Sequence, residues 1–265
     1  MTLILRLGQK MVISSKKNEL SGDTIIRVPL GFKAAGPLNQ ERPDVADTLE
    51  HVVDRKEFKI RLADTHGQRS SASMLIKKMY SWRGYQTAFN AEEQPNRMTL
   101  VASSDDQTIG TMTIGFDSPI GLLADDLYQV ELNALRSQGR RLCEFTKLAV
   151  DGEIKSKQVL AALFHIAFIY SFEIQKFTDL LIEVNPRHVK YYERMLGFAG
   201  WAETRINRRV NAPAVLLRLE LDYVRAQINR YGGKPETASS EKSLYPFAFS
   251  QAEAVGISNR LAHLS

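Results

Sequence analysis

Apolar residues along 57–221 recur with two periods, which indicate strands and helices in turn. Runs of alternating or continuous apolar residues predict strands at 57–63, 97–104, 108–116, 142–150, 178–184 and 212–221. Apolar stripes at helical spacing predict helices at 71–82 and 123–139, from Ser156 onward, and through 186–196. "GFAGW" (197–201) fits a further short strand. The order β-α-β-β-α-β-α-β-α-β predicts an α/β (α+β) fold, with a mixed central sheet and helices on both faces.

The two ends of the chain lack this regular pattern. Residues 1–55 contain Gly and Pro breaks and read as a weakly structured arm. Residues 232–265 begin "GGKPETASS", which is typical of a flexible linker, and their "YPFAF" segment is expected to dock on the main body or on another subunit. The predicted organisation is therefore an arm (1–55), a central domain (56–231), and a linker and tail (232–265).

The strand "LCEFTKLAV" (142–150) carries polar residues within an apolar run. Because side chains alternate between faces, a regular strand would place Glu144 and Thr146 on one face with Leu142, Leu148 and Val150. Cys143, Phe145, Lys147 and Ala149 would share the other face. A carboxylate between leucines, leading into a very apolar helix, is a candidate for chemistry.

Composition narrows the class of protein. The 265 residues are 44% hydrophobic and contain one cysteine, Cys143, so no internal disulfide can form. The strand position of Cys143 favours a buried core residue over a nucleophile. The N-terminal apolar run is too short for a signal peptide, and the longest run, 159–170, is too short to span a bilayer. We therefore expect a cytoplasmic protein with no integral membrane segment.

The net charge of +5 is modest, although Arg and Lys cluster around 140–157 and 205–209. These clusters fit an acidic protein partner as well as nucleic acid. No zinc-ligand spacing, recognition-helix pattern or stacking-aromatic motif accompanies them, so we expect neither a metal site nor a nucleic-acid partner.

Several motifs carry a family resemblance. "IEVNPRHVKYYERMLGF" resembles the last conserved segment of the GNAT-type N-acetyltransferases, and "CEFTKLAVD" resembles a strand of the acyl-homoserine lactone autoinducer synthases. Together with "GTMTIGFDSPIGLLADDLY", "ALFHIAFIY" and "RVNAPAVLLRL", they are similar to the long-chain N-acyl amino acid synthases, a branch between those two families. The resemblance covers roughly residues 57–231. It implies a GNAT-type fold and transfer of a fatty acyl group from a thioester to an amino acid.

One departure from the GNAT pattern concerns the acyl donor. GNAT enzymes that use coenzyme A hold its pyrophosphate in a Gly-rich loop before a helix. The corresponding segment here, "DGEIKSKQVL", lacks the Gly pair. An acyl carrier protein presents its thioester on phosphopantetheine with a single phosphate, which Lys155, Ser156 and Lys157 could meet. Ser156 could equally be a simple N-cap between two solvated lysines. The expected donor is acyl carrier protein, with no bound cofactor.

A second departure concerns the leaving group. GNAT enzymes often place a tyrosine four residues before the Gly of Gly-Phe to protonate the thiolate. Glu193 occupies that position here, and Tyr192 is one residue earlier, about 100° away on a helix. The role of general acid is therefore not carried over, and Tyr191 and Tyr192 are interpreted as packing residues.

The resemblance places an active-site carboxylate at Glu144. A carboxylate in a partly apolar setting has a raised proton affinity, which suits a general base near neutral pH. The alternative is an ion pair with a neighbouring Lys or Arg. In GNAT folds this strand bulges and splays from the next, and the backbone N–H groups of Leu148, Ala149 and Val150 would stabilise the thioester oxygen here.

Each of the two substrates needs residues that bind it. Phe164 and Phe168 of the apolar helix could line a slot for the acyl chain, while His165 is interpreted as a buried histidine bonded to the backbone, or else as a catalytic helper. An amino acid's carboxylate needs a cation. The candidates are Arg83, Arg187 and Lys147, the last only if a bulge turns it to the face of Glu144. His188 is a further candidate beside Asn185, which is expected to cap the next helix.

Two alternatives remain open from the sequence. The same donor could be combined with S-adenosylmethionine in an autoinducer synthase, although no tryptophan-rich pattern is evident before residue 80. The chain could also be a catalytically silent module that binds carrier protein, against which the retained Glu144 and "NPRH" argue. The sequence does not select the amino acid, the acyl length or the oligomeric state.

Overall fold

The computed structural model describes residues 24–29, 57–63, 66–81, 96–151 and 157–263. Their strands form one sheet in the order β1-β2-β3-β4-β5-β6-β9-β7, with β8 paired to β9, and every pairing is antiparallel except β5–β6. The strands are β1 Thr24–Pro29, β2 Glu57–Leu62, β3 Arg97–Ser104, β4 Gln107–Phe116, β5 Leu142–Val150, β6 Asp179–Val184, β7 Ala199–Gly200, β8 Arg205–Asn207 and β9 Ala212–Glu220.

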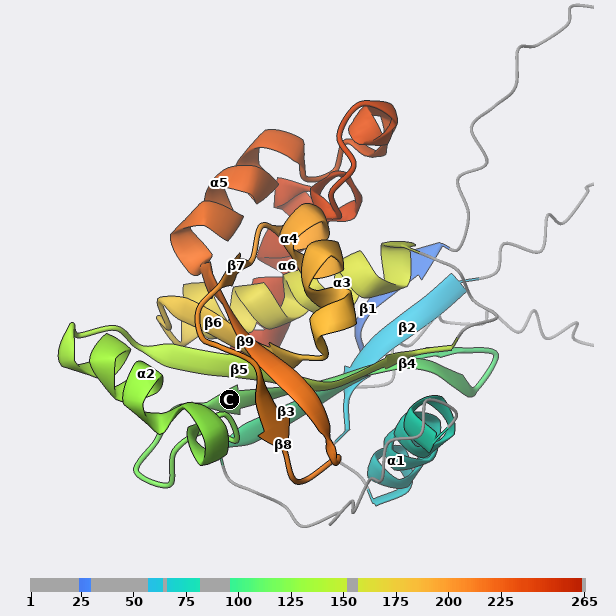
Figure 1. Cartoon of the computed structure of the whole chain (residues 1–265). Coiled ribbons are helices and arrows are strands. Elements are labelled where there is room, and N and C mark those ends of the chain that lie inside the picture. Colours follow the sequence, from blue (N-terminus) through green and yellow to red (C-terminus); the bar gives the residue numbers. More distant parts are fainter. Residues whose placement is uncertain (1–23, 30–56, 64–65, 82–95, 152–156, 264–265) are drawn as a thin grey trace, which may run out of the picture.

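Helices cover both faces of the sheet (Figure 1). One face carries α1 and α2, and the other carries α3 to α6. The helices are α1 His66–Ser81, α2 Asp125–Ser137, α3 Lys157–Phe168 continued by the π-helix η1 Ile169–Ile174, α4 Val189–Leu196, α5 Leu221–Tyr231 and α6 Gln251–Ala262, with 3₁₀ turns η2 Pro186–His188, η3 Pro235–Ser239 and η4 Tyr245–Phe247. The mixed sheet and the expected element order are confirmed, and β1, β8, α5 and α6 are additions to it.

The middle of β5 is interrupted by a β-bulge. Thr146 lies opposite Thr113 and Ala149 opposite Thr111, so Lys147 and Leu148 together face one residue of β4. Lys147 adopts a left-handed φ of 51°, a conformation more usual for glycine. The bulge shifts the alternation of side chains from this point onward.

The bulge overturns the expected faces of β5. Leu148 and Val150 pack with the main core on the α3 side, whereas Ala149 contacts α1. The expectation that Leu148 and Val150 share the face of Glu144 is therefore wrong. The reason is that one extra residue reverses the period-two pattern.

Strands β5 and β6 separate soon after they meet. Their parallel pairing covers Leu142 to Glu144 on β5 and Asp179 to Leu181 on β6. Among the described residues, no pairing with β6 continues beyond Glu144. The carboxyl-terminal half of β5 therefore presents a backbone edge toward a gap in the sheet, as expected for this fold.

The apolar helix α3 is buried at Val159 and from Ala161 to Phe168, a stretch that includes His165. Nδ1 of His165 accepts a hydrogen bond from the backbone N–H of Phe249 at 2.9 Å, so the interpretation of a buried, backbone-bonded histidine fits. By length and composition alone, Lys157–Ile174 could cross a membrane, but 61% of it is buried inside the protein, the usual environment of a core helix. Cys143 is fully buried, and burial raises the pKa of its thiol far above the usual range.

The C-terminal residues differ from the expected flexible linker. After α5, the η3 and η4 turns lead to α6, which packs against η1 and β1. Tyr245 donates its hydroxyl to the carbonyl of Leu196 at 2.5 Å, and Ser250 caps α6 in a capping box with Glu253. The "YPFAF" segment therefore docks on the main body, one of the two expected outcomes.

Candidate functional site

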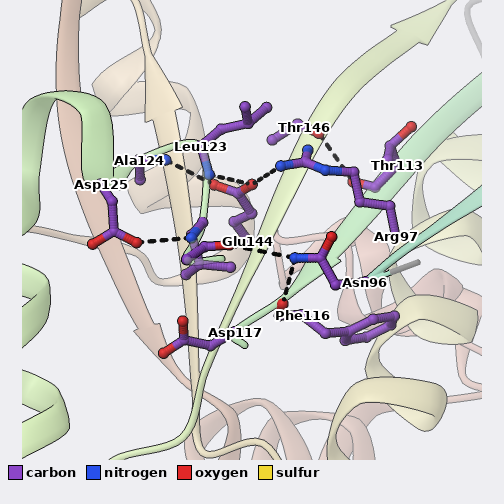
Figure 2. A network of polar contacts seen from close by, with 12 residues as sticks. Asn96, Arg97, Thr113, Phe116, Asp117, Leu123, Ala124, Asp125, Glu144 and Thr146 are labelled. Carbon is purple, nitrogen blue, oxygen red and sulfur yellow. Dashed lines mark hydrogen bonds and ion pairs between the residues drawn. The ribbon is translucent and has the colours of Figure 1, made fainter. Parts of the chain in front are cut away.

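The carboxylate of Glu144 lies at the start of the gap between β5 and β6. Its side chain is 2% exposed, and it accepts hydrogen bonds from the backbone N–H groups of Leu123 at 2.8 Å and Ala124 at 3.0 Å (Figure 2). Arg97 lies 3.3 Å away on β3. Burial raises the pKa of Glu144 above its usual value, against the lowering effect of the N–H groups and of Arg97.

The two N–H donors belong to the turn that starts α2. Backbone N–H groups at a helix start have no partner within the helix, and the dipole there favours an anion. The turn is fixed by Asp125, which accepts from the N–H of Leu122 and pairs with Arg136. Arg136 also pairs with Asp117. Although burial opposes it, the hydrogen bonds from Arg136 hold the pKa of Asp125 below its usual value.

Gly115 makes room for the contact between Glu144 and Arg97. In the sheet register, Gly115 of β4 lies between Arg97 on β3 and Glu144 on β5. A Cβ at Gly115 would lie 2.8 Å from both Cγ and Oε1 of Glu144. The glutamate side chain therefore crosses the strand where a side chain is missing, and reaches the guanidinium two strands away.

A second cation, Lys147, lies at the bulge itself. Burial and the charge of Arg97 lower the pKa of Lys147. Within the described residues, Nε of Arg97 is buried without a hydrogen-bond partner. An anionic ligand would satisfy this buried guanidinium N–H.

A second carboxylate, Glu183, lies on β6 across the gap. It accepts from Asn207 at 2.7 Å and pairs with Arg209 at 2.8 Å. Burial raises the pKa of Glu183, and the like charge of Glu144 acts in the same direction. Arg209 also donates to the carbonyl of Leu123, so it ties Glu183 to the turn that binds Glu144. Two carboxylates with raised pKa values at one gap are typical of a functional site.

On the α3 side, the gap borders an apolar cavity. Phe145, the residue after Glu144, lines it together with Leu180 of β6 and Phe164 and Phe168 of α3. The free space inside is about 30 Å³. A group seated in the gap would thus have the Glu144 carboxylate on one face of the sheet and an apolar cavity on the other.

Other candidates lie at the same end of the sheet. Arg187 and His188 follow β6 directly, and Nε of Arg187 donates to Nε2 of His188 at 3.2 Å. Asn185 caps this turn by accepting from the N–H of Arg187, as expected. Lys157 lies at the start of α3, 6.0 Å from the ring centroid of Phe247. Leu148 accepts a hydrogen bond at its carbonyl from Tyr80 of α1.

Three of the expected site residues, Arg83, Lys155 and Ser156, lie outside the described residues. Tyr192 packs edge-to-face on Phe198, as a packing residue does, whereas Tyr191 is 43% exposed and contacts Tyr192. Among the described residues, no group of three or more His, Cys, Asp or Glu side chains could hold a metal ion.

Comparison with known proteins identifies the family. Residues 71–220, more than half of the chain, match the family described as N-acyl amino acid synthase FeeM. The chain belongs to this FeeM family. None of the curated proteins matches the chain in sequence.

The solved structure of FeeM agrees with this assignment. The chain is similar to FeeM, an N-acyl amino acid synthase from uncultured soil microbes, with 26% identity and a TM-score of 0.58 over 64% of this chain and 94% of FeeM. An acyl-CoA N-acyltransferase from Pseudomonas aeruginosa aligns at 14% identity, with a TM-score of 0.45 over 62% of this chain and 98% of its own. An N-acetyltransferase from Staphylococcus aureus aligns over the same shares at 11% identity, with a TM-score of 0.45.

The FeeM family assignment makes the chain an acyltransferase with a GNAT-type fold. Membership does not by itself assign roles to side chains, and the geometry adds residues that sequence patterns missed. Glu183 could have been identified as a site candidate from the sequence, since it is a carboxylate in the apolar run "LLIEV", just as Glu144 is in its own strand. Arg97 and Gly115 could not have been identified in this way, because the contact of Arg97 with Glu144 across Gly115 depends on the register of three strands.

We expect Gly115→Ala to reduce kcat/KM by about 10² or more, because the added methyl displaces the Glu144 carboxylate from its N–H donors. Activity and melting temperature should be measured together. The matched control is Gly110→Ala on the same strand, whose Cβ would press on Val159 and Leu163 instead. That variant should lose stability but retain kcat/KM per folded molecule. Normal kcat/KM in Gly115→Ala would contradict the geometry described for Glu144.

Proposed function

We propose that this enzyme transfers a long-chain fatty acyl group from acyl carrier protein to the α-amino group of an amino acid, in the cytoplasm. The observation that carries the proposal is the placement of Glu144 at the gap between β5 and β6. A carboxylate with a raised pKa, paired with Arg97, lies on one face of the sheet, and an apolar cavity lies on the other. This separation suits a polar acceptor and an apolar donor that meet at a thioester.

The reaction follows from these positions. Glu144 accepts a proton from the substrate ammonium, directly or through one water. The freed amine attacks the thioester carbonyl, and its oxygen is stabilised by backbone N–H groups in the stretch from Leu148 to Val150 beside the gap. The carbon–nitrogen bond forms and the carbon–sulfur bond breaks, and the second proton that the nitrogen loses as the amide forms balances the proton that the leaving thiolate gains.

The acceptor's carboxylate would lie against Lys147 and Arg97. Arg97 pairs with Glu144 and has a buried Nε without a hydrogen-bond partner among the described residues, and Lys147 lies at the bulge of the strand that carries Glu144. An amino acid bound there would place its amine near Glu144 and its carboxylate near the cations. Arg83, Arg187 and His188 remain further candidates for this side of the site.

The choice of acyl carrier protein as the acyl donor rests on positive charge near the start of α3 and on a motif that is missing there. The segment before α3 lacks the Gly pair that holds the pyrophosphate of coenzyme A, so phosphopantetheine on a carrier protein is the better fit. Lys155, Ser156 and Lys157 would meet its single phosphate. The position of Arg140 and Arg141 excludes them from binding this phosphate. They precede β5 at the opposite end of the sheet, and Arg140 is bound to the buried Asp179.

Acyl carrier protein should support much faster turnover than the matching acyl-coenzyme A. The Lys155→Glu, Lys157→Glu double variant should raise KM for the carrier protein and reduce its dependence on salt. The control is Lys176→Glu, an exposed lysine at the opposite end of the sheet, which should leave KM unchanged. Equal rates with the two donors would overturn the assignment of carrier protein.

Lys147→Met should raise KM for a free amino acid by about 10- to 100-fold, because a charge-assisted contact is lost. The methyl ester of the same amino acid should be a poor substrate for the wild type and should be no worse for the variant. Lys147→Arg, which restores the charge, serves as the control. If esters or simple amines are acylated as well as the amino acid, the acceptor is not recognised through its carboxylate.

A further inference from the structure

The cavity beside the gap is closed by a segment outside the family match. Leu244, Tyr245 and Ala248 form part of its wall, as do Phe164 and Phe168 of α3. The match to the FeeM family ends at residue 220, and these residues belong to the C-terminal segment that follows α5. The wall at this point is therefore an addition to the region that defines the family.

The residues of this wall are buried and are hydrogen-bonded to the rest of the protein. Leu244 and Tyr245 are 1% and 4% exposed, and the hydroxyl of Tyr245 is bonded to the carbonyl of Leu196. The N–H of Phe249 is bonded to His165, whose ring stacks on that of Phe249 with centroids 5.4 Å apart. Beyond the wall, Arg260 of α6 donates to the carbonyl of Ile25 in β1.

These contacts explain why a histidine interrupts an apolar helix. His165 also lines the cavity, and its Nδ1 fixes the backbone of the wall. Burial lowers the pKa of His165 to about 4, so the ring is neutral at pH 7 and can accept this hydrogen bond. The segment 244–249 is thus fastened at both of its ends, to Leu196 through Tyr245 and to α3 through Phe249.

We propose that the segment 244–249 is the end wall of the acyl slot and sets the longest acyl chain that the enzyme accepts. The inference rests on the proposed function, because it takes the cavity as the place of the acyl chain. Phe145 and Leu180 line the cavity on the two strands that flank the gap, so a chain attached to a thioester in the gap would run toward Leu244 and Ala248.

The size of the cavity supports a limit on length. Its free space of about 30 Å³ is comparable with the volume of one water molecule, so an acyl chain that extends past it must displace the wall. Each methylene that is accommodated should contribute roughly fourfold in kcat/KM. A methylene that collides with a well-packed wall should cost about 10-fold or more. The acyl-length profile should therefore drop sharply after its optimum.

The experiment measures kcat/KM for a series of saturated acyl carrier proteins, from eight to eighteen carbons, with the amino acid held constant. Leu244→Ala removes three carbons from the wall and should move the optimum about two to three carbons longer. Ala248→Leu adds three and should move it shorter by a similar amount. The control is Leu261→Ala, another fully buried leucine in the same C-terminal region, which does not line the cavity.

The expected result is opposite shifts in Leu244→Ala and Ala248→Leu, with the wild-type optimum in Leu261→Ala. An unchanged profile in both wall variants, in protein that is folded and active, would overturn the end wall and leave the proposed function intact. If the wild type acylates no amino acid from any donor in the series, the proposed function itself fails. If one wall variant does not fold, the other alone decides the direction of the shift.

Discussion

The site depends on a single buried carboxylate that is held from three directions. Glu144 receives two N–H groups from the turn before α2 and faces Arg97 across a strand that has no side chain at Gly115. A charged group this deeply buried is tolerated only when it is hydrogen-bonded or paired. The turn that supplies the N–H groups is in turn fixed by Asp125 and Arg136.

Burial also shifts the pKa values of the ionisable side chains around the gap. Desolvation raises the pKa values of Glu144 and Glu183 and lowers that of Lys147, so each is moved toward its neutral form. The like charge of Glu144 contributes to the raised pKa of Glu183, so the ionisation of the two carboxylates is linked. A pair of this kind can exchange protons with a substrate near neutral pH, which isolated surface carboxylates do poorly.

Much of the fold followed from sequence because strong periodicity marks each central element. Strands β2 to β6 and β9, and helices α1 to α4, lie where the apolar spacing placed them. The bulge at Lys147 could not be located from the residues themselves, since a lysine in a left-handed conformation is held there by its neighbours. Its consequence, the reversal of faces at Leu148 and Val150, was missed for the same reason.

The C-terminal residues and the partners of Glu144 show the other limit of sequence analysis. "GGKPETASS" has the composition of a linker, yet its hydrogen-bonded turns and the contacts of Tyr245 and Phe249 bind it to the core. Such docking depends on complementary surfaces distant in the chain, which no local pattern reveals. Glu144 itself was identifiable, because a lone carboxylate in an apolar strand is unusual wherever it occurs.

The central claim is that Glu144 is a general base and not merely half of a buried ion pair with Arg97. The most direct measurement is kcat against pH for Glu144→Gln, together with its melting temperature on the same sample. A base predicts a folded variant whose kcat falls by about 10² to 10⁴ near neutral pH, with a loss that shrinks as rising pH supplies free amine. A variant that melts earlier because Arg97 is left unpaired, yet keeps wild-type kcat per folded molecule, would contradict the account.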